Sequence, residues 1–152
     1  DIAFTAPQLQ AQLDRKFPRD YKKLGGLLNF SLMNPRLSLP PGGRLHLDFD
    51  IGMGGPGTAR TPSGHFSVES GLRFDPGTRG LHMDQPQIVA VDVPALGGVM
   101  NDGARNMLNS WLLDYAREEP VYRLDDSTVG RMASRRIERV DIDPGLITIR
   151  LD

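Results

Sequence analysis

Apolar residues recur at two different spacings along this chain, and the change of spacing separates helices from strands. Near the start, Leu9, Leu13 and Phe17 recur at every fourth position, which is the spacing of one face of an α-helix. Thr5 and the glutamine three residues after it match a capping box, a common beginning of a helix. The pattern therefore predicts a helix that begins after Thr5 and ends at Pro18.

The apolar period falls to two between Leu28 and Val93, as in antiparallel strands that bury one face and expose the other. Strands usually have about five or six residues, and longer one-sided strands bend. We expect the bends to be β-bulges at Pro35 and Pro86, where the alternation is interrupted. The predicted strands lie near residues 28–39, 45–53, 66–74 and 81–93.

Helical spacing returns between Pro94 and Glu118. The apolar positions form a broad stripe, and such width predicts contacts on more than one side of the helix. We therefore expect a long curved antiparallel sheet to wrap around a long amphipathic helix. The stripe consists of Leu96, Val99, Met100, Met107, Leu108, Trp111, Leu112 and Tyr115.

The rest of the chain returns to the spacing of strands. Residues 125–136 are expected to form a loop or a short helical turn. No internal repeat or linker divides the sequence, so we predict a single α+β domain over residues 1–152 with the order α-β-β-β-β-α-β-β-β. The last three strands are expected at residues 121–124, 137–142 and 147–151.

Composition excludes several kinds of chemistry. The chain has no cysteine, so it contains neither a disulfide nor a thiol nucleophile. Its formal net charge of −1 gives no general attraction to nucleic acid. No apolar run reaches the length of about 18–20 residues that a transmembrane helix needs. Because the first residue is Asp1 and not methionine, we expect that an N-terminal segment has been removed.

The most suggestive polar pattern is formed by His46, Asp48 and Asp50, which would project from one face of a strand. A metal ion could bind there, but the solvent face of a half-buried strand explains the same residues. The glycines between Gly52 and Gly57 lack the lysine of a phosphate-binding loop and are expected to form a hairpin loop. We therefore predict no catalytic residue, no metal and no cofactor.

A local excess of positive charge accompanies the end of the first predicted helix. Anionic lipid headgroups could bind such a cluster. Cations at the end of a helix also interact favourably with the helix dipole, and this second interpretation is the simpler one. The cluster consists of Arg15, Lys16, Arg19, Lys22 and Lys23.

Three features follow one another in a characteristic order. They are the Leu9, Leu13 and Phe17 stripe, the segment EEPVYRLDD at residues 118–126, and the hairpin sequence IDPGLITI at residues 142–149. Together they resemble the YceB-like lipoproteins of Gram-negative bacteria, a family without an assigned biochemical role. The resemblance covers nearly the whole chain, in order and spacing.

Membership would imply a domain of the periplasm that is anchored to a membrane through a lipidated cysteine upstream of Asp1. It would also imply a fold similar to half of a tubular lipid-binding protein, in which a curved sheet wraps a long helix and leaves an apolar channel. The family has no catalytic motif to carry over to this sequence.

The first functional hypothesis is a membrane-tethered lipoprotein domain that binds a lipid or another elongated hydrophobic ligand between sheet and helix, without catalysis. Burial of apolar area would supply the affinity. The alternative is an envelope lipoprotein with a dry core that binds a protein partner. The predicted ligand-binding residues are Leu96, Met100, Met107 and Trp111 on the helix, and Leu47, Phe49, Phe66 and Phe74 on the sheet.

Overall fold

A computed structural model shows an α+β fold with two antiparallel sheets and three helices, and it describes residues 1–23, 28–53, 62–93 and 97–152. The elements follow roughly the predicted order. They are β1 (Ile2–Thr5), α1 (Ala6–Lys16), β2 (Arg19–Lys23), β3 (Leu28–Ser38), β4 (Leu45–Met53), β5 (Gly64–Asp75), β6 (Gly80–Asp92), α2 (Gly97–Glu118), β7 (Tyr122–Arg123), α3 (Asp126–Met132), β8 (Ile137–Asp143) and β9 (Leu146–Leu151).

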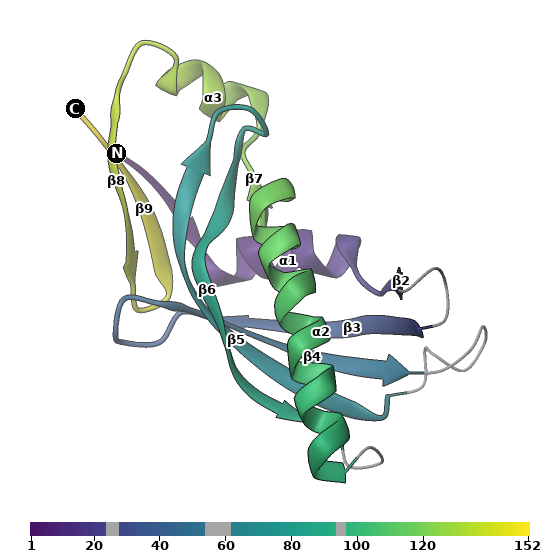
Figure 1. Cartoon of the computed structure of the whole chain (residues 1–152). Coiled ribbons are helices and arrows are strands. Elements are labelled where there is room, and N and C mark those ends of the chain that lie inside the picture. The colour runs from purple at the N-terminus through teal and green to yellow at the C-terminus, as the bar shows by residue number, and fades with distance from the viewer. Residues whose placement is uncertain (24–27, 54–61, 94–96) are drawn as a thin grey trace.

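The larger sheet has the strand order β2-β3-β4-β5-β6-β7, and the smaller has the order β1-β9-β8. The hairpin of β5 and β6 extends out of the larger sheet toward α3 and the smaller sheet (Figure 1). Helix α2 lies along β6, and α1 contacts β3. The hairpin and β8 therefore approach each other beyond the part of the sheet that α2 covers, where β8 contacts β5.

β-Bulges bend the larger sheet at the two predicted prolines. The β3–β4 register shifts around Pro35, where Asn34 has a φ of 53°. The β5–β6 register shifts twice near Pro86, where Gln85 has a φ of 51°. Bulges increase the local twist, so the two ends of β5 and β6 face different neighbours. The prediction of bulges at Pro35 and Pro86 is confirmed.

A continuous hydrophobic core connects both sheets with the helices. Leu9 and Leu13 of α1, Leu108 and Leu112 of α2, and Ile147 of β9 are all fully buried in this cluster. Burial of each such side chain contributes about 1.5–3 kcal/mol relative to leaving it in water. The core therefore holds the small sheet against the larger one.

The turn between β8 and β9 also connects the sheets through the backbone. The amide of Gly145 donates to the Leu39 carbonyl at 2.9 Å, and its carbonyl accepts from the Ala6 amide at 3.3 Å. Gly145 has a φ of 75°, which an L side chain rarely adopts. This is the Asp-Pro-Gly turn that the sequence predicts, and it brings β8 into a defined position.

Helix α1 begins as predicted, with a complete capping box at Thr5. The Thr5 amide donates to Gln8 Oε1 at 2.8 Å, and the Gln8 amide donates to Thr5 Oγ1 at 3.4 Å. Three elements were not predicted as such. Strands β1 and β2 are short, and α3 occupies seven residues of the segment expected to be a loop or a helical turn.

Helix α2 spans 22 residues, and its outer side is exposed to solvent. Leu113 is 51% exposed, and Asn109 and Arg117 are exposed on the same helix. The larger sheet therefore covers one side of the part of α2 whose side chains the structure describes. No helix in the described ranges combines the length and the apolar character needed to cross a membrane.

Gly80 and Gly103 give a matched test of this packing. A Cβ atom at Gly80 would lie 2.5 Å from Pro120 Cβ and 2.9 Å from the Tyr122 carbonyl oxygen, whereas one at Gly103 meets nothing within 4 Å. We expect Gly80→Ala to lower the free energy of unfolding by about 1–3 kcal/mol. Gly103→Ala should raise it by up to about 1 kcal/mol, because alanine favours the helix. Urea unfolding measures both, and equal effects would contradict the β6–β7 geometry.

Candidate functional site

The predicted groove between α2 and the sheet is filled by side chains around Trp111. The rings of Phe49 and Phe66 lie 5.8 and 5.9 Å from the Trp111 ring, centroid to centroid, and 5.3 Å from each other. Trp111 is 3% exposed, and Leu47, Phe49 and Phe66 are 1%, 1% and 0% exposed. These four predicted ligand-binding residues therefore come together, but as packed core.

The other four predicted ligand-binding residues are Leu96, Met100, Met107 and Phe74. Met107 is partly buried against the core. Leu96 lies outside the described residues, and the side chain of Met100 is not among those described. Phe74 lies near the far end of β5, away from Trp111, and contributes to a different pocket. A groove at the first turns of α2 stays a prediction.

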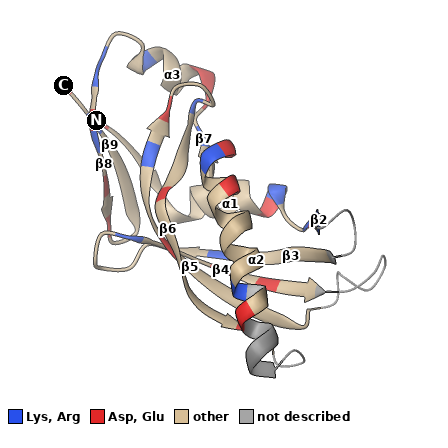
Figure 2. Cartoon of the chain, in the orientation of Figure 1, with Lys and Arg blue, Asp and Glu red and all other residues tan. Residues whose placement is uncertain are grey.

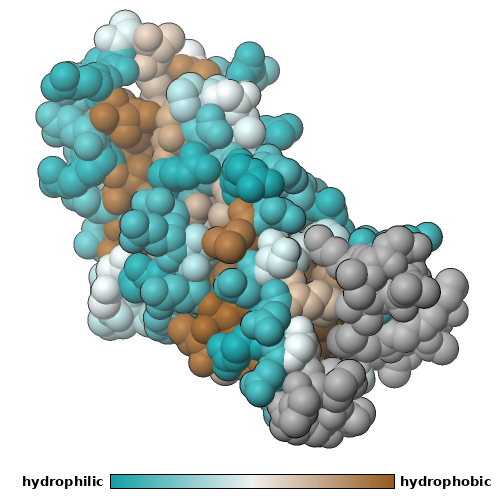
Figure 3. All heavy atoms as spheres, in the orientation of Figure 1, coloured by the Kyte–Doolittle hydropathy of each residue, from teal (hydrophilic) through white to brown (hydrophobic). Residues whose placement is uncertain are grey.

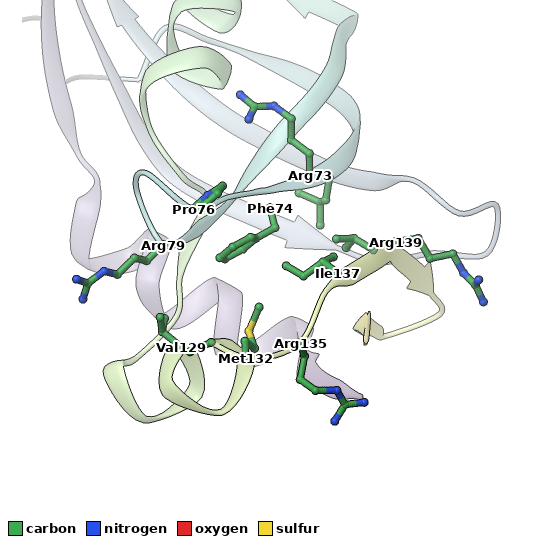
Figure 4. A pocket seen from close by; sticks show the side chains of 12 residues that line it. Arg73, Phe74, Pro76, Arg79, Val129, Met132, Arg135, Ile137 and Arg139 are labelled. Atoms are coloured by element: carbon green, nitrogen blue, oxygen red, sulfur yellow. The ribbon is translucent and has the colours of Figure 1, made fainter. Parts of the chain in front are cut away.

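An open pocket of about 690 Å³ lies where the β5–β6 hairpin, α3 and β8 meet. Phe74 from β5 and Ile137 from β8 point toward one another, and Val129 and Met132 approach from α3 (Figure 4). Figure 3 shows an apolar strip in this region at the upper left, bordered by hydrophilic residues. The volume falls within the range of about 300–1,000 Å³ that small-molecule sites occupy.

The charged residues that line the pocket are Arg73, Arg79, Arg135 and Arg139, and no aspartate or glutamate belongs to the lining. Their side-chain stems surround the apolar floor, and their guanidinium groups point outward (Figure 4). Arginines appear on the hairpin, on α3 and before β8, with acidic residues at the start of α3 and on β8 (Figure 2). The pocket therefore combines an apolar interior with a cationic rim.

Each of these arginines already has an interaction within the protein. Arg79 pairs with Asp126 at 3.1 Å, and Arg139 pairs with Asp141 at 2.9 Å. Arg73 lies 3.8 Å from an oxygen of Asp75 and donates to the Ala116 carbonyl at 3.4 Å. Arg135 donates to the Asp152 carbonyl. The rim is therefore organised before any ligand arrives.

The N-terminus of α3 is held by Asp125, whose carboxylate accepts from the Thr128 amide at 2.7 Å and from the Ser127 hydroxyl at 2.9 Å. Hydrogen bonding from the Thr128 side chain, together with the bonds from the Thr128 amide and Ser127, favours the ionised form and lowers the pKa of Asp125. The cap and the spacing of Val129 and Met132 were the available sequence signals for this helix. They were missed because seven residues are too few for a clear period.

The candidate metal residues lie on the outer face of β4, where His46 pairs with Glu69 at 3.0 Å. His46, Asp48 and Asp50 are only partly buried, as the solvent-face interpretation expects. Across the described part of the chain, no three histidine, aspartate or glutamate residues are grouped so that they could hold a metal ion.

His82 is fully buried and connects the hairpin to α2. Its Nδ1 lies 2.8 Å from the Ala116 carbonyl oxygen, which can only accept, so Nδ1 carries a proton. Its Nε2 then accepts from the Thr78 hydroxyl at 2.6 Å in the neutral ring. A catalytic triad needs its carboxylate on the other ring nitrogen, whereas Asp75 approaches Nε2 at 3.8 Å. This geometry orients the hairpin and does not activate Thr78.

Two cations of the predicted basic cluster are used within the fold. Arg19 binds both carboxylate oxygens of Glu119, at 2.8 and 2.9 Å. Lys16 donates to the Pro120 carbonyl, and burial lowers the pKa of Lys16. These contacts attach the end of α1 and the start of β2 to the residues that follow α2, which favours a structural role for this pair over headgroup binding.

Comparison of the chain with known family models and with curated proteins finds no match in either set. The pocket and the packing around it are therefore the basis for a functional assignment. Its apolar interior suits a hydrophobic ligand, and the described residues around it offer no nucleophile with a base in catalytic geometry.

We predict that Asp125→Ala loosens α3, whereas Asp125→Asn preserves it, because asparagine also caps helices well. Hydrogen exchange of the α3 amides measures the difference. The lowered pKa of Asp125 means that its contribution is present above the unfolded pKa of about 4 and is lost as the pH falls through the lower folded pKa. Asp125→Asn should remove this acid dependence, and equal exchange in all three proteins would contradict the capping role.

Tyr115 should make the fold sensitive to alkali. Its side chain is 4% exposed, burial raises its pKa, and its hydroxyl has no hydrogen-bond partner among the described residues. The unfolded chain therefore loses this proton first, and stability falls above about pH 10 by up to about 1.4 kcal/mol per pH unit. Tyr115→Phe should flatten this fall in urea titrations at pH 7 to 11. Tyr122→Phe, at a more exposed position, should flatten it less.

Proposed function

We propose that this chain is a non-catalytic binding domain of the YceB-like lipoprotein class that holds a lipid or another elongated hydrophobic ligand. The observation that supports the proposal is the apolar pocket between the β5–β6 hairpin, α3 and β8. Met132 and Leu72 are nearly buried at 6% and 8% exposure, and Phe74 and Ile137 remain partly exposed. An apolar ligand that covers them gains about 25 cal/mol for each Å² removed from water.

The bent sheet is consistent with the expected likeness to half of a tubular lipid-binding protein. In the proposed function, the sheet and α2 form that half, and the ligand occupies the hairpin end of the fold. The packing around Trp111 argues for this end, because Phe49 and Phe66 already fill the space beside the middle of α2. The domain acts in the periplasm, tethered to a membrane through a lipidated cysteine upstream of Asp1.

A second function is favoured by the same packing around Trp111. An envelope lipoprotein with a dry core would bind a protein partner and no lipid. The pocket distinguishes the two proposals, because only the first requires an acyl chain to enter it.

Blocking the pocket tests the first proposal. Ala133 lines the pocket and is exposed at the end of α3, so Ala133→Trp should occupy part of the volume without disturbing the core. We expect it to lower the uptake of a fluorescent fatty acid at least tenfold. Leu113→Trp places the same side chain on the exposed face of α2 and should leave uptake unchanged. Absence of uptake by the unmodified protein would favour the dry-core alternative.

Chain length provides a second measurement. Each CH₂ group that enters the pocket contributes about 0.8 kcal/mol, or about a fourfold gain in affinity, until the pocket is filled. A series of saturated fatty acids should therefore show a steep rise in affinity followed by a plateau. Equal affinity along the whole series would contradict burial of the chain.

The position of the ligand can be read from Trp111, the single tryptophan of the chain. A bromine atom quenches tryptophan only at close range, so a brominated fatty acid in the α3 pocket should leave the emission nearly unchanged. Strong quenching by the bound acid would instead favour the groove beside α2.

A further inference from the structure

The charged side chains that line the pocket are all arginines, and their acidic partners lie outside the lining. Arginine side chains from the hairpin, from the segment between α3 and β8, and from β8 surround one apolar opening, and the pocket lining contains no carboxylate. An uncharged ligand would gain no electrostatic stabilisation from these arginines. An anion attached to an apolar chain matches both parts, because its chain fits the interior and its charge fits the rim.

Arginine side chains can contact both the apolar chain and the anionic group of such a ligand. Arginine stems pack along apolar surface while the guanidinium group stays in water. The planar guanidinium group binds carboxylate or phosphate oxygens through two parallel hydrogen bonds. In Figure 4 the stems of Arg79, Arg135 and Arg139 border the pocket, and their guanidinium groups lie outside it. To bind an anion at the opening, these exposed side chains turn from their present directions toward the pocket.

The present partners of Arg79 and Arg139 can be exchanged at low cost. The side chains of Arg79 and Asp126 are 59% and 93% exposed, and such surface pairs contribute little to stability. Arg139 is 63% exposed. Its partner Asp141 also binds Arg150 at 2.8 Å, so it stays paired when Arg139 turns toward a ligand. Both arginines can therefore bind an anion without leaving an uncompensated buried charge.

On the basis of the proposed function, we propose that the ligand is a single-chain anionic lipid whose carboxylate or phosphate is bound by Arg79 and Arg139 at the pocket opening. Arg73 and Arg135 add positive potential on either side. The pocket volume of about 690 Å³ suits one chain with one headgroup. The headgroup stays at the surface, where it can be passed to or taken from a membrane.

The test compares a fatty acid with the fatty alcohol of the same chain length, by calorimetry at low salt. The unmodified protein should bind the acid at least about tenfold more tightly, as expected for hydrogen bonds to a charged group. The double variant Arg79→Gln with Arg139→Gln should lower the affinity for the acid nearly to that for the alcohol, and it should leave the affinity for the alcohol unchanged. Salt of 0.5 M should also reduce the preference, because exposed charges are screened.

A control pair separates local charge from net charge. Arg105→Gln with Arg117→Gln removes the same charge from exposed positions on α2 and should keep the preference for the acid. If it abolishes the preference equally, a specific rim is excluded. Equal affinity for acid and alcohol in the unmodified protein would overturn the headgroup assignment while the proposed function stands. Binding of neither would defeat the proposed function itself.

Two further measurements test whether the pocket binds something other than an anionic lipid. Inorganic phosphate alone should not compete with the fatty acid at millimolar concentration, because it has no chain to bury. Competition at that level would mean a free-anion site. Size-exclusion chromatography should show no dimer that depends on Arg79 and Arg139, since such a dimer would mean that a second copy of the chain covers the pocket.

Discussion

The bend in β5 and β6 is the constraint on which most of this structure depends. Strands that bury one face over so many residues need a partner for that face along their whole length. Helix α2 alone does not cover the apolar face of β5 and β6 along their whole length. Beyond the bulges near Pro86, the apolar face of the hairpin meets α3 and β8, while His82 still contacts the last turn of α2. The same bend that completes the core therefore creates the pocket.

The two ends of the sheet differ in how completely their apolar face is covered. Beside the middle of α2, large aromatic rings contact each other and exclude solvent. At the hairpin, a seven-residue helix and the edge strand of a three-stranded sheet provide less apolar surface. Close packing is expected of a core, whereas a remaining open volume lined by apolar side chains is typical of a binding site. The proposed ligand site therefore lies at the less covered end.

The contacts that position the hairpin are internal, whereas the contacts at its rim are exposed. His82 is held between Thr78 and the Ala116 carbonyl and connects the hairpin to α2. The side chains of Arg79 and Arg139 at the rim are themselves largely solvated. Stability thus rests on groups that a ligand does not reach. The groups that would meet a ligand are free to change partners at little cost in stability.

The sequence by itself determined which residues face inward, where the long strands bend and where α1 begins, because these depend on local spacing and capping. It also predicted that Phe49, Phe66 and Trp111 belong together. Local spacing cannot show what an apolar face will meet, so it could not separate Phe74 from that group. Nor could it bring residues 72–79 next to residues 129–140. Only the tertiary structure decided that the middle of α2 is packed and that the hairpin end is open, because packing depends on which distant elements share a surface.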